Sequence, residues 1–183
     1  MRYLLHFRLV GLLLLATLLC SACQRFIPSV QGLKTVEWPS LNYQRQDQIE
    51  VQWKDKSFSF LLYQQQQGQA LELVALSLTG QPLFQVVFDG QKVIVKQRID
   101  QMKLLPFDYV VRDLLYATYP NYKTQAQIKN EDNKKIVSIN HQTILNILMQ
   151  DHLIELNNIQ VPYQMIISPV DESLENDGEI NAQ

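Results

Sequence analysis

Residues 84–96, FQVVFDGQKVIVK, decide the expected fold of this chain. Apolar side chains stand at every second position on both sides of a central Asp-Gly pair: Phe84, Val86 and Phe88 before it, Val93 and Val95 after it. Alternation of this kind is typical of antiparallel strands, and Asp-Gly favours a tight two-residue turn in which both central residues adopt positive φ. The stretch therefore predicts a β-hairpin at Asp89-Gly90.

The same two-residue period precedes this hairpin from Gln48 onward. Three earlier stretches alternate in this way, and polar turn residues separate them: 49–53, 58–62 and 71–75. Together with the hairpin they predict five antiparallel strands connected as a meander. The glutamines at 64–67 directly follow the second stretch, so we interpret them as a polar strand end and turn.

A helical period replaces the strand period after Leu105. Six side chains fall at i, i+3, i+4, i+7, i+8 and i+11, on one stripe of a helix: Phe107, Val110, Val111, Leu114, Leu115 and Thr118. Pro106 suits the first turn and Pro120 marks the end, which predicts a helix over about 106–118. Polar residues lie off the stripe, and we expect Arg112 and Asp113 to form exposed ion pairs.

Weaker strand patterns follow the helix, over 124–129, 136–140, 143–149, 153–157 and 161–168. Segment 143–149 is equally consistent with a short helix, because short apolar runs do not decide between the two. The whole predicts a mainly β domain over 48–169, in which one helix covers a sheet of about ten strands. A sheet of that size curls, and one helix leaves inward apolar surface uncovered, so we expect an apolar cavity.

Inward-facing apolar side chains are the candidates to line this cavity and to contact an acyl chain. They are Trp53, Phe58, Phe60, Leu62, Phe84, Val86, Phe88, Val111, Leu114, Leu115 and Tyr116. Each of them, taken alone, is more often an ordinary core residue than a ligand contact.

The first 23 residues carry the pattern of a secretion and lipidation signal. Arg2 and Arg8 precede an apolar run at 9–19, and the small residues Ser21-Ala22 stand before Cys23. The run would rise only about 16 Å as a helix, against a bilayer core of about 30 Å, which disfavours a membrane-spanning anchor. We therefore expect a signal peptide over 1–22 and lipidation of Cys23, whose acyl chains attach the mature chain to a membrane.

Two polar segments flank the expected domain. Residues 23–47 contain Pro28, Gly32 and Pro39 without a sustained period, which predicts a lipidated N-terminus and tether. Residues 170–183 carry five acids and no base, which predicts a disordered acidic tail. Loss of 1–22 leaves 14 basic against 18 acidic residues, a net charge of −4, so no electrostatic feature favours nucleic acid.

The sequence lacks a catalytic constellation. Motifs of nucleophilic hydrolases, zinc proteases and phosphate-binding loops are absent, and we expect no enzyme activity, no metal site and no cofactor. His141 and His152 are the only histidines of the mature chain, and a metal would need a third ligand. We expect both in exposed turns; a lipid-modifying enzyme would instead need one of them beside carboxylates at the cavity mouth.

The order of these features resembles the LolB-like bacterial outer-membrane lipoproteins, in particular a branch often encoded beside aryl polyene biosynthesis genes. The resemblance spans residues 48–168 and is carried by LSLTGQPLF at 76–84, Phe88-Asp89-Gly90, Leu105-Pro106 through Leu115, and Leu156-Asn157-Asn158 before Tyr163. It implies a curved, incompletely closed antiparallel β-barrel covered by a helix, with a cavity that accepts acyl chains.

The resemblance also implies an outer-membrane location facing the periplasm. In LolB an apolar residue on a loop after the third strand helps to deliver lipoprotein to the bilayer; the matching loop is 78–83, which makes Leu78 the candidate. The implied role is a carrier or receptor that binds an acyl or lipid chain in lipoprotein or aryl polyene lipid localisation. The alternative is a structural accessory lipoprotein with a packed interior that docks a partner in an envelope assembly.

Overall fold

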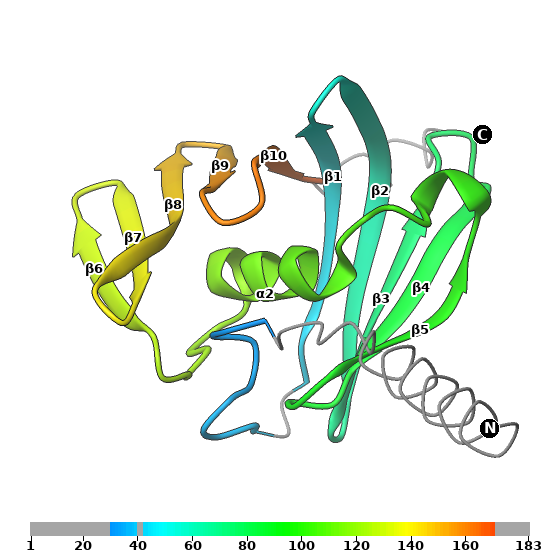
Figure 1. Cartoon of the computed structure of the whole chain (residues 1–183). Helices are drawn as coiled ribbons and strands as arrows, with labels where there is room; N and C mark the ends of the chain where they lie inside the picture. Colours follow the sequence, from blue (N-terminus) through cyan, green and yellow to red (C-terminus); the bar gives the residue numbers. More distant parts are fainter. Residues whose placement is uncertain (1–29, 40–41, 171–183) are drawn as a thin grey trace, which may run out of the picture.

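The computed structural model describes residues 30–39 and 42–170 (Figure 1). The predicted signal peptide, Cys23 and residues 171–183 of the expected tail lie outside these residues. Within the described part, ten antiparallel strands form a single sheet that is not closed, and one α-helix lies against it. The prediction of a mainly β fold with a helix on an open, curved sheet is confirmed.

The strands are connected as two meanders. The first comprises β1 (Gln44–Trp53), β2 (Lys56–Gln67), β3 (Ala70–Leu76), β4 (Pro82–Phe88) and β5 (Val93–Arg98). The second comprises β6 (Gln127–Glu131), β7 (Lys134–Ile139), β8 (Gln142–Gln150), β9 (Leu153–Asn158) and β10 (Tyr163–Pro169). Pairing of β1 with β10 joins them, so the spatial order is β5-β4-β3-β2-β1-β10-β9-β8-β7-β6.

The two edges of the sheet are β5 and β6. Both edge strands carry exposed charged side chains, Lys96 and Arg98 on β5 and Lys129 and Glu131 on β6. Charges at these positions discourage pairing with a strand of another molecule. The segment 143–149 lies within β8, which pairs with both β7 and β9, so its strand alternative is confirmed.

The predicted helix is α2 (Phe107–Thr118), which follows a 3₁₀ turn, η2 (Asp100–Met102). Figure 1 shows α2 lying within the curve of the sheet, between the β1–β5 side and the β6–β9 side. Pro106 precedes its first residue, as expected, and the helix ends before Tyr119-Pro120. The apolar stripe is buried: Phe107, Val110, Val111, Leu114 and Leu115.

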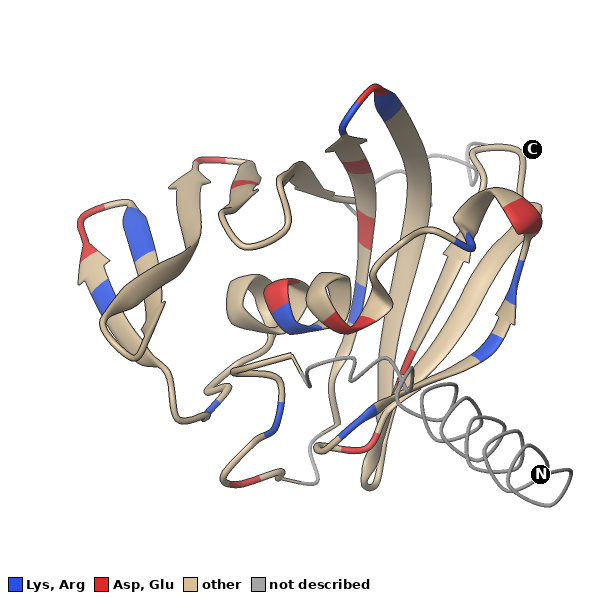
Figure 2. Ribbon diagram, in the orientation of Figure 1, with Lys and Arg blue, Asp and Glu red and all other residues tan. Residues whose placement is uncertain are grey.

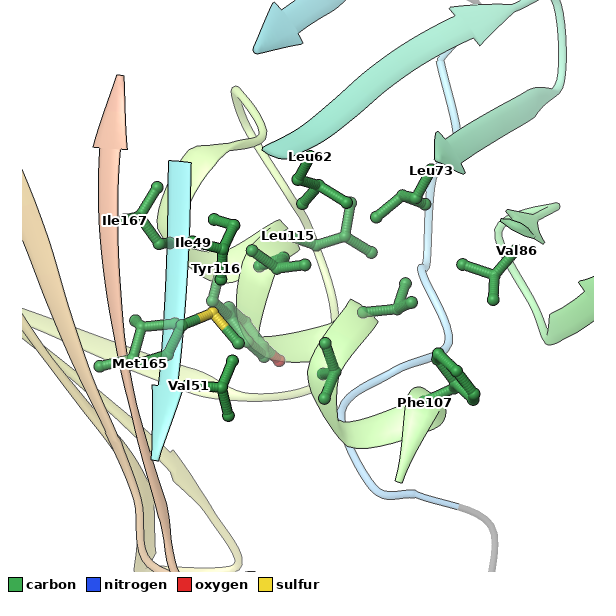
Figure 3. Close-up of a cluster of buried hydrophobic side chains, with 14 of the residues drawn as sticks. Ile49, Val51, Leu62, Leu73, Val86, Phe107, Leu115, Tyr116, Met165 and Ile167 are labelled. Carbon is green, nitrogen blue, oxygen red and sulfur yellow. The ribbon is translucent and has the colours of Figure 1, made fainter. Parts of the chain in front are cut away.

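The core fills the space between α2 and the concave face of the sheet. Successive strand residues point to opposite faces, so every second side chain is buried in the middle of β1, at positions 47–51, and along β3 and β4. Figure 3 shows side chains from both meanders meeting the helix, with Ile49, Leu62 and Met165 turned toward Leu115 and Tyr116. One core therefore joins the two halves of the sheet.

The turn between β4 and β5 differs from the prediction. The hairpin is present, but four residues, 89–92, connect its strands, and of Asp89 and Gly90 only Gly90 has positive φ, +89°. The Asp89 carboxylate accepts hydrogen bonds from the backbone N–H groups of Gln91 and Lys92, at 2.9 Å each. The predicted two-residue turn is wrong because this side chain stabilises a longer one.

The N-terminal boundary of the fold also differs from the prediction. Instead of a free tether up to residue 47, residues 30–38 pack onto the domain, and β1 begins at Gln44. Val30 and Leu33 are buried in the core. The backbone N–H of Thr35 donates to the Gly90 carbonyl at 2.9 Å, which fixes this segment on the β4–β5 turn.

Gly90 is a position where substitution should be costly. A Cβ there would lie 2.8 Å from Cγ of Trp38, and φ is positive. We expect Gly90→Ala to lower the free energy of unfolding by roughly 2–4 kcal/mol, combining a left-handed backbone with overpacking. Gly80→Ala is the matched control in urea denaturation, because φ is +83° but no atom lies within 4 Å. An equal loss in both variants would show that the Trp38 contact is irrelevant.

Candidate functional site

The concave side of the sheet around α2 holds most of the residues predicted to contact an acyl chain. Nine of the eleven are buried: Phe60, Leu62, Phe84, Val86, Phe88, Val111, Leu114, Leu115 and Tyr116. The other two, Trp53 and Phe58, are half-buried and pack against the same cluster. The structure thus brings the whole set together from β1, β2, β4 and α2.

These side chains pack against one another. The rings of Phe60 and Phe84 meet edge to face at 5.5 Å, and Phe84 meets Phe107 of α2 in the same way at 5.0 Å. Aromatic pairs at such separations add to the stability gained by burial. The apolar space between sheet and helix is therefore occupied by the side chains of α2 and of the facing strands.

Five hollows on the described surface, with volumes of about 250–650 Å³, lie elsewhere. None of these five is lined by a residue of α2. The one lined by Val51, Phe58 and Ile166 lies over β1, β2 and β10. An acyl chain that occupied the predicted position would have to take the place of α2.

A buried ion pair lies in the middle of α2. The prediction of exposed ion pairs is wrong, because the side chains of Arg112 and Asp113 are both 0% exposed. Arg112 Nε donates to Asp113 Oδ1 at 2.8 Å. Figure 2 shows that α2, which lies within the curve of the sheet, carries both positive and negative positions.

The second carboxylate oxygen of Asp113 binds residues of the second meander. Asn158, the last residue of β9, donates to Oδ2 at 2.5 Å, and the hydroxyl of Tyr163 on β10 also donates to it. Burial raises the pKa of Asp113 above its usual range, and Arg112 and the donated hydrogen bonds oppose that shift. The carboxylate therefore links α2 to two strands through polar contacts in the buried interior.

Arg112 makes a different set of contacts. Its Nη1 donates to the Gln31 carbonyl at 3.1 Å and to Oε1 of Gln160 at 2.6 Å. The guanidinium lies 4.9 Å from the ring centroid of Tyr109, close enough for a cation–π interaction. Its Nη2 is buried without a hydrogen-bond partner among the described residues. The N-terminal segment at Gln31 and the β9–β10 loop at Gln160 thus cover the side of the helix that carries Arg112.

A second polar cluster lies at the C-terminal end of α2. Gln64 on β2 is fully buried and donates to Asp47 on β1 at 3.3 Å and to Thr118 at 3.4 Å. Arg45 binds the same Asp47 carboxylate through Nε and Nη2. The glutamine block does end a strand at a turn, as interpreted, but Gln64 and Gln66 face inward. The two-residue period of the sequence could have predicted this inward orientation, because positions 64 and 66 continue the inward-facing series 58, 60 and 62.

Tyr43 closes this cluster and should give a pH-dependent stability. Its hydroxyl donates to Thr118 at 3.3 Å, and burial raises its pKa from 10 to about 12. Because the folded-state pKa exceeds the unfolded value, this contribution is complete below pH 10 and is lost as the pH rises toward 12. The two-unit difference corresponds to about 3 kcal/mol. We expect the free energy of unfolding to decrease less between pH 10 and 12 in Tyr43→Phe than in the wild type. Identical pH profiles of the unfolding free energy for the two chains would contradict this.

The part of the chain that matches a known family comprises the sheet and the helix described above. A family model with the description "Protein of unknown function (DUF3261)" matches residues 44–171. The chain belongs to the DUF3261 family. The DUF3261 region begins at the first residue of β1 and ends two residues after β10. It contains α2 and the residues of both polar clusters except Gln31 and Tyr43. A search of curated proteins found no match.

The remaining candidate residues lie apart from the helix interface of this DUF3261 domain. Leu78 is 60% exposed in the loop between β3 and β4. His141 and His152 are exposed in the turns at the two ends of β8. Over residues 30–39 and 42–170, no three or more His, Cys, Asp and Glu side chains are grouped as metal ligands would be. Among the same residues, no helix has the length and apolar character needed to cross a membrane.

Proposed function

We propose that this protein is an outer-membrane lipoprotein, anchored through Cys23 and facing the periplasm, that binds a lipid acyl chain on the concave side of its sheet. It acts as a carrier or receptor in the localisation of lipoproteins or aryl polyene lipids, the role implied by the LolB-like resemblance. Binding is by burial of apolar surface and requires no covalent step.

One observation carries this proposal: among the described residues, α2, with 12 residues, is the one α-helix that packs on the apolar concave face of the unclosed ten-stranded sheet. The middle of that helix bears the buried pair Arg112–Asp113. Desolvation of two charges offsets much of their attraction, so such a pair holds a helix less strongly than apolar residues of similar volume. α2 is therefore the element that can leave the core and admit a ligand.

The free energies of helix packing and chain burial are comparable. Five buried apolar side chains on the α2 stripe contribute roughly 8–15 kcal/mol, at about 1.5–3 kcal/mol each. A sixteen-carbon chain would gain roughly 10 kcal/mol on burial, at about 0.8 kcal/mol per methylene and before association costs. The gain from burying an acyl chain is thus of the same order as the loss of the apolar packing of α2.

The test uses the mature chain from position 23 with Cys23→Ser, secreted behind a cleavable signal that does not direct lipidation. Native mass spectrometry should show a co-purifying lipid, and titration should show saturable uptake of a fluorescent fatty acid at one site per chain. Absence of both would overturn the acyl-binding proposal. Mass spectrometry of the wild-type amino terminus tests the anchor separately, and an unmodified Cys23 would overturn it.

A second candidate function is a structural accessory lipoprotein that docks a partner in an envelope assembly. The filled interior favours it, as does apolar surface on the outer face of the sheet. There Leu61 pairs with Leu76, and Tyr63, which is 37% exposed, pairs with Val74. A chain that takes up no lipid but is retained on an envelope complex would support this candidate over the carrier.

A further inference from the structure

The chain between the proposed lipid anchor and the folded domain is short. Val30, the first described residue, is buried in the core, and it follows Cys23 by seven positions. Seven residues span at most about 25 Å even when fully extended. If Cys23 is lipidated, as proposed above, Val30 must lie within that distance of the bilayer surface.

Residues 30–38 are fixed at one end of the sheet. The N–H of Thr35 donates to the Gly90 carbonyl at 2.9 Å, and the N–H of Val36 donates to the Lys123 carbonyl at 3.0 Å. The hydroxyl of Tyr116 donates to the Gly32 carbonyl at 3.0 Å. We call this the anchor end; it comprises residues 30–38, the β4–β5 turn 89–92 and the loop 121–126. Figure 1 shows these segments grouped on one side of α2.

The anchor end has the chemistry of a surface that meets phospholipid headgroups. Val36 is 66% exposed there. The charged residues of the three segments are three lysines and two acids: Lys34, Lys92, Lys123, Glu37 and Asp89. The net charge of this end is thus +1, although that of the mature chain is −4. Lysines close to an anionic membrane surface are attracted to it.

The candidate loop with Leu78 lies at the other end of the sheet. Strand β4 runs from that loop to the β4–β5 turn, and its seven residues cover about 23 Å. The residues after β5 return to this end of the sheet, where the N–H of Ile99 donates to the Leu83 carbonyl at 2.9 Å. Leu104 therefore lies near the same end. Leu78 and Leu104 are 60% and 66% exposed.

We propose that the anchor end rests on the bilayer that holds Cys23, with Val36 and Lys34 against the phospholipid headgroups, and that the Leu78 loop points away from this bilayer. The proposal depends on the proposed lipidation of Cys23. It follows that Leu78 does not insert into the membrane to which its own chain is anchored. An incoming acyl chain would reach the domain from the end opposite to the anchor.

The test places one fluorescent label on the lipoprotein reconstituted in phospholipid vesicles that contain anionic lipid and a lipid-attached quencher. Labelling is selective because Cys20 and Cys23 are the only cysteines of the sequence. The expected signal-peptide cleavage removes Cys20, and the expected lipidation modifies the thiol of Cys23. Val36→Cys reports on the anchor end, and Leu78→Cys is the matched control at similar exposure. Lys92→Cys and Leu104→Cys repeat the comparison at each end.

We expect quenching at positions 36 and 92 to exceed that at positions 78 and 104 at least several-fold. Equal quenching at both ends, or stronger quenching at position 78, would overturn the orientation while leaving a lipidated Cys23 intact. Detection of an unmodified Cys23 by mass spectrometry would instead overturn both the anchor and the orientation. The two failures are therefore distinguishable.

Discussion

Replacement of Asp113 by alanine is expected to lower the free energy of unfolding by about 3–5 kcal/mol. The substitution leaves the Arg112 guanidinium buried without its anion, and it removes the acceptor for Asn158 and Tyr163. Each group left unsatisfied in the interior adds its own desolvation cost. Urea denaturation of the Cys23→Ser mature chain, with and without Asp113→Ala, measures the difference.

Two controls distinguish the effect of the buried pair on stability from the effect of charged residues on the helix in general. Asp108→Ala removes an exposed acid from the first turn of the same helix, and we expect a loss below about 1 kcal/mol. Replacing both charges, as Arg112→Met with Asp113→Leu, should cost less than Asp113→Ala alone, because no charge is then left buried and unpaired. A loss of under 1 kcal/mol for Asp113→Ala would contradict the account of the pair.

Truncation of Leu115 should have the second large effect, on both stability and binding. Leu115 is fully buried where α2 faces the sheet, and Leu115→Ala is expected to lower the free energy of unfolding by about 2–5 kcal/mol. If an acyl chain binds by taking the place of α2, the weaker helix packing should also tighten the uptake of a fluorescent fatty acid. Titration of both chains at equal concentration measures this change.

The control for Leu115 is an aliphatic residue on the outer face. Val74→Ala on β3 shortens a half-buried side chain that faces away from α2, so fatty-acid uptake should equal that of the wild type. Weaker uptake by Leu115→Ala than by the wild type would contradict exchange of the helix, because it would mean that Leu115 itself contacts the bound chain.

Local periodicity predicted the strands and the helix well. The alternation through 49–62 and the 3.6-residue period from Phe107 to Thr118 depend on near neighbours, and both formed the expected elements. The burial of Arg112 and Asp113 could not be seen in this way. A stripe predicts which face of a helix is apolar, but here the curved sheet and the segment at Gln31 surround α2 on more than one side.

The prediction of a cavity did not allow for residues outside the helix that also cover the concave face of the sheet. Residues 30–38 have no period, yet Val30 and Leu33 pack into the core, and Trp38 stacks on Tyr119 at 4.9 Å. Loop aromatics such as Tyr122, which is also buried, add further filling. Their contacts join positions 80 to 90 residues apart, and a single sequence gives no local signal for such pairing.

The most direct test of acyl binding is photochemical. A fatty acid that carries a diazirine midway along its chain is bound to the Cys23→Ser mature chain and irradiated, and the cross-linked peptides are mapped by mass spectrometry. We expect saturable attachment to inward residues of β2, β3 and β4, such as Leu62, Leu73 and Val86, which only a displaced α2 leaves accessible. Attachment confined to outer-face residues such as Tyr63 and Ile166, or no attachment, would contradict it.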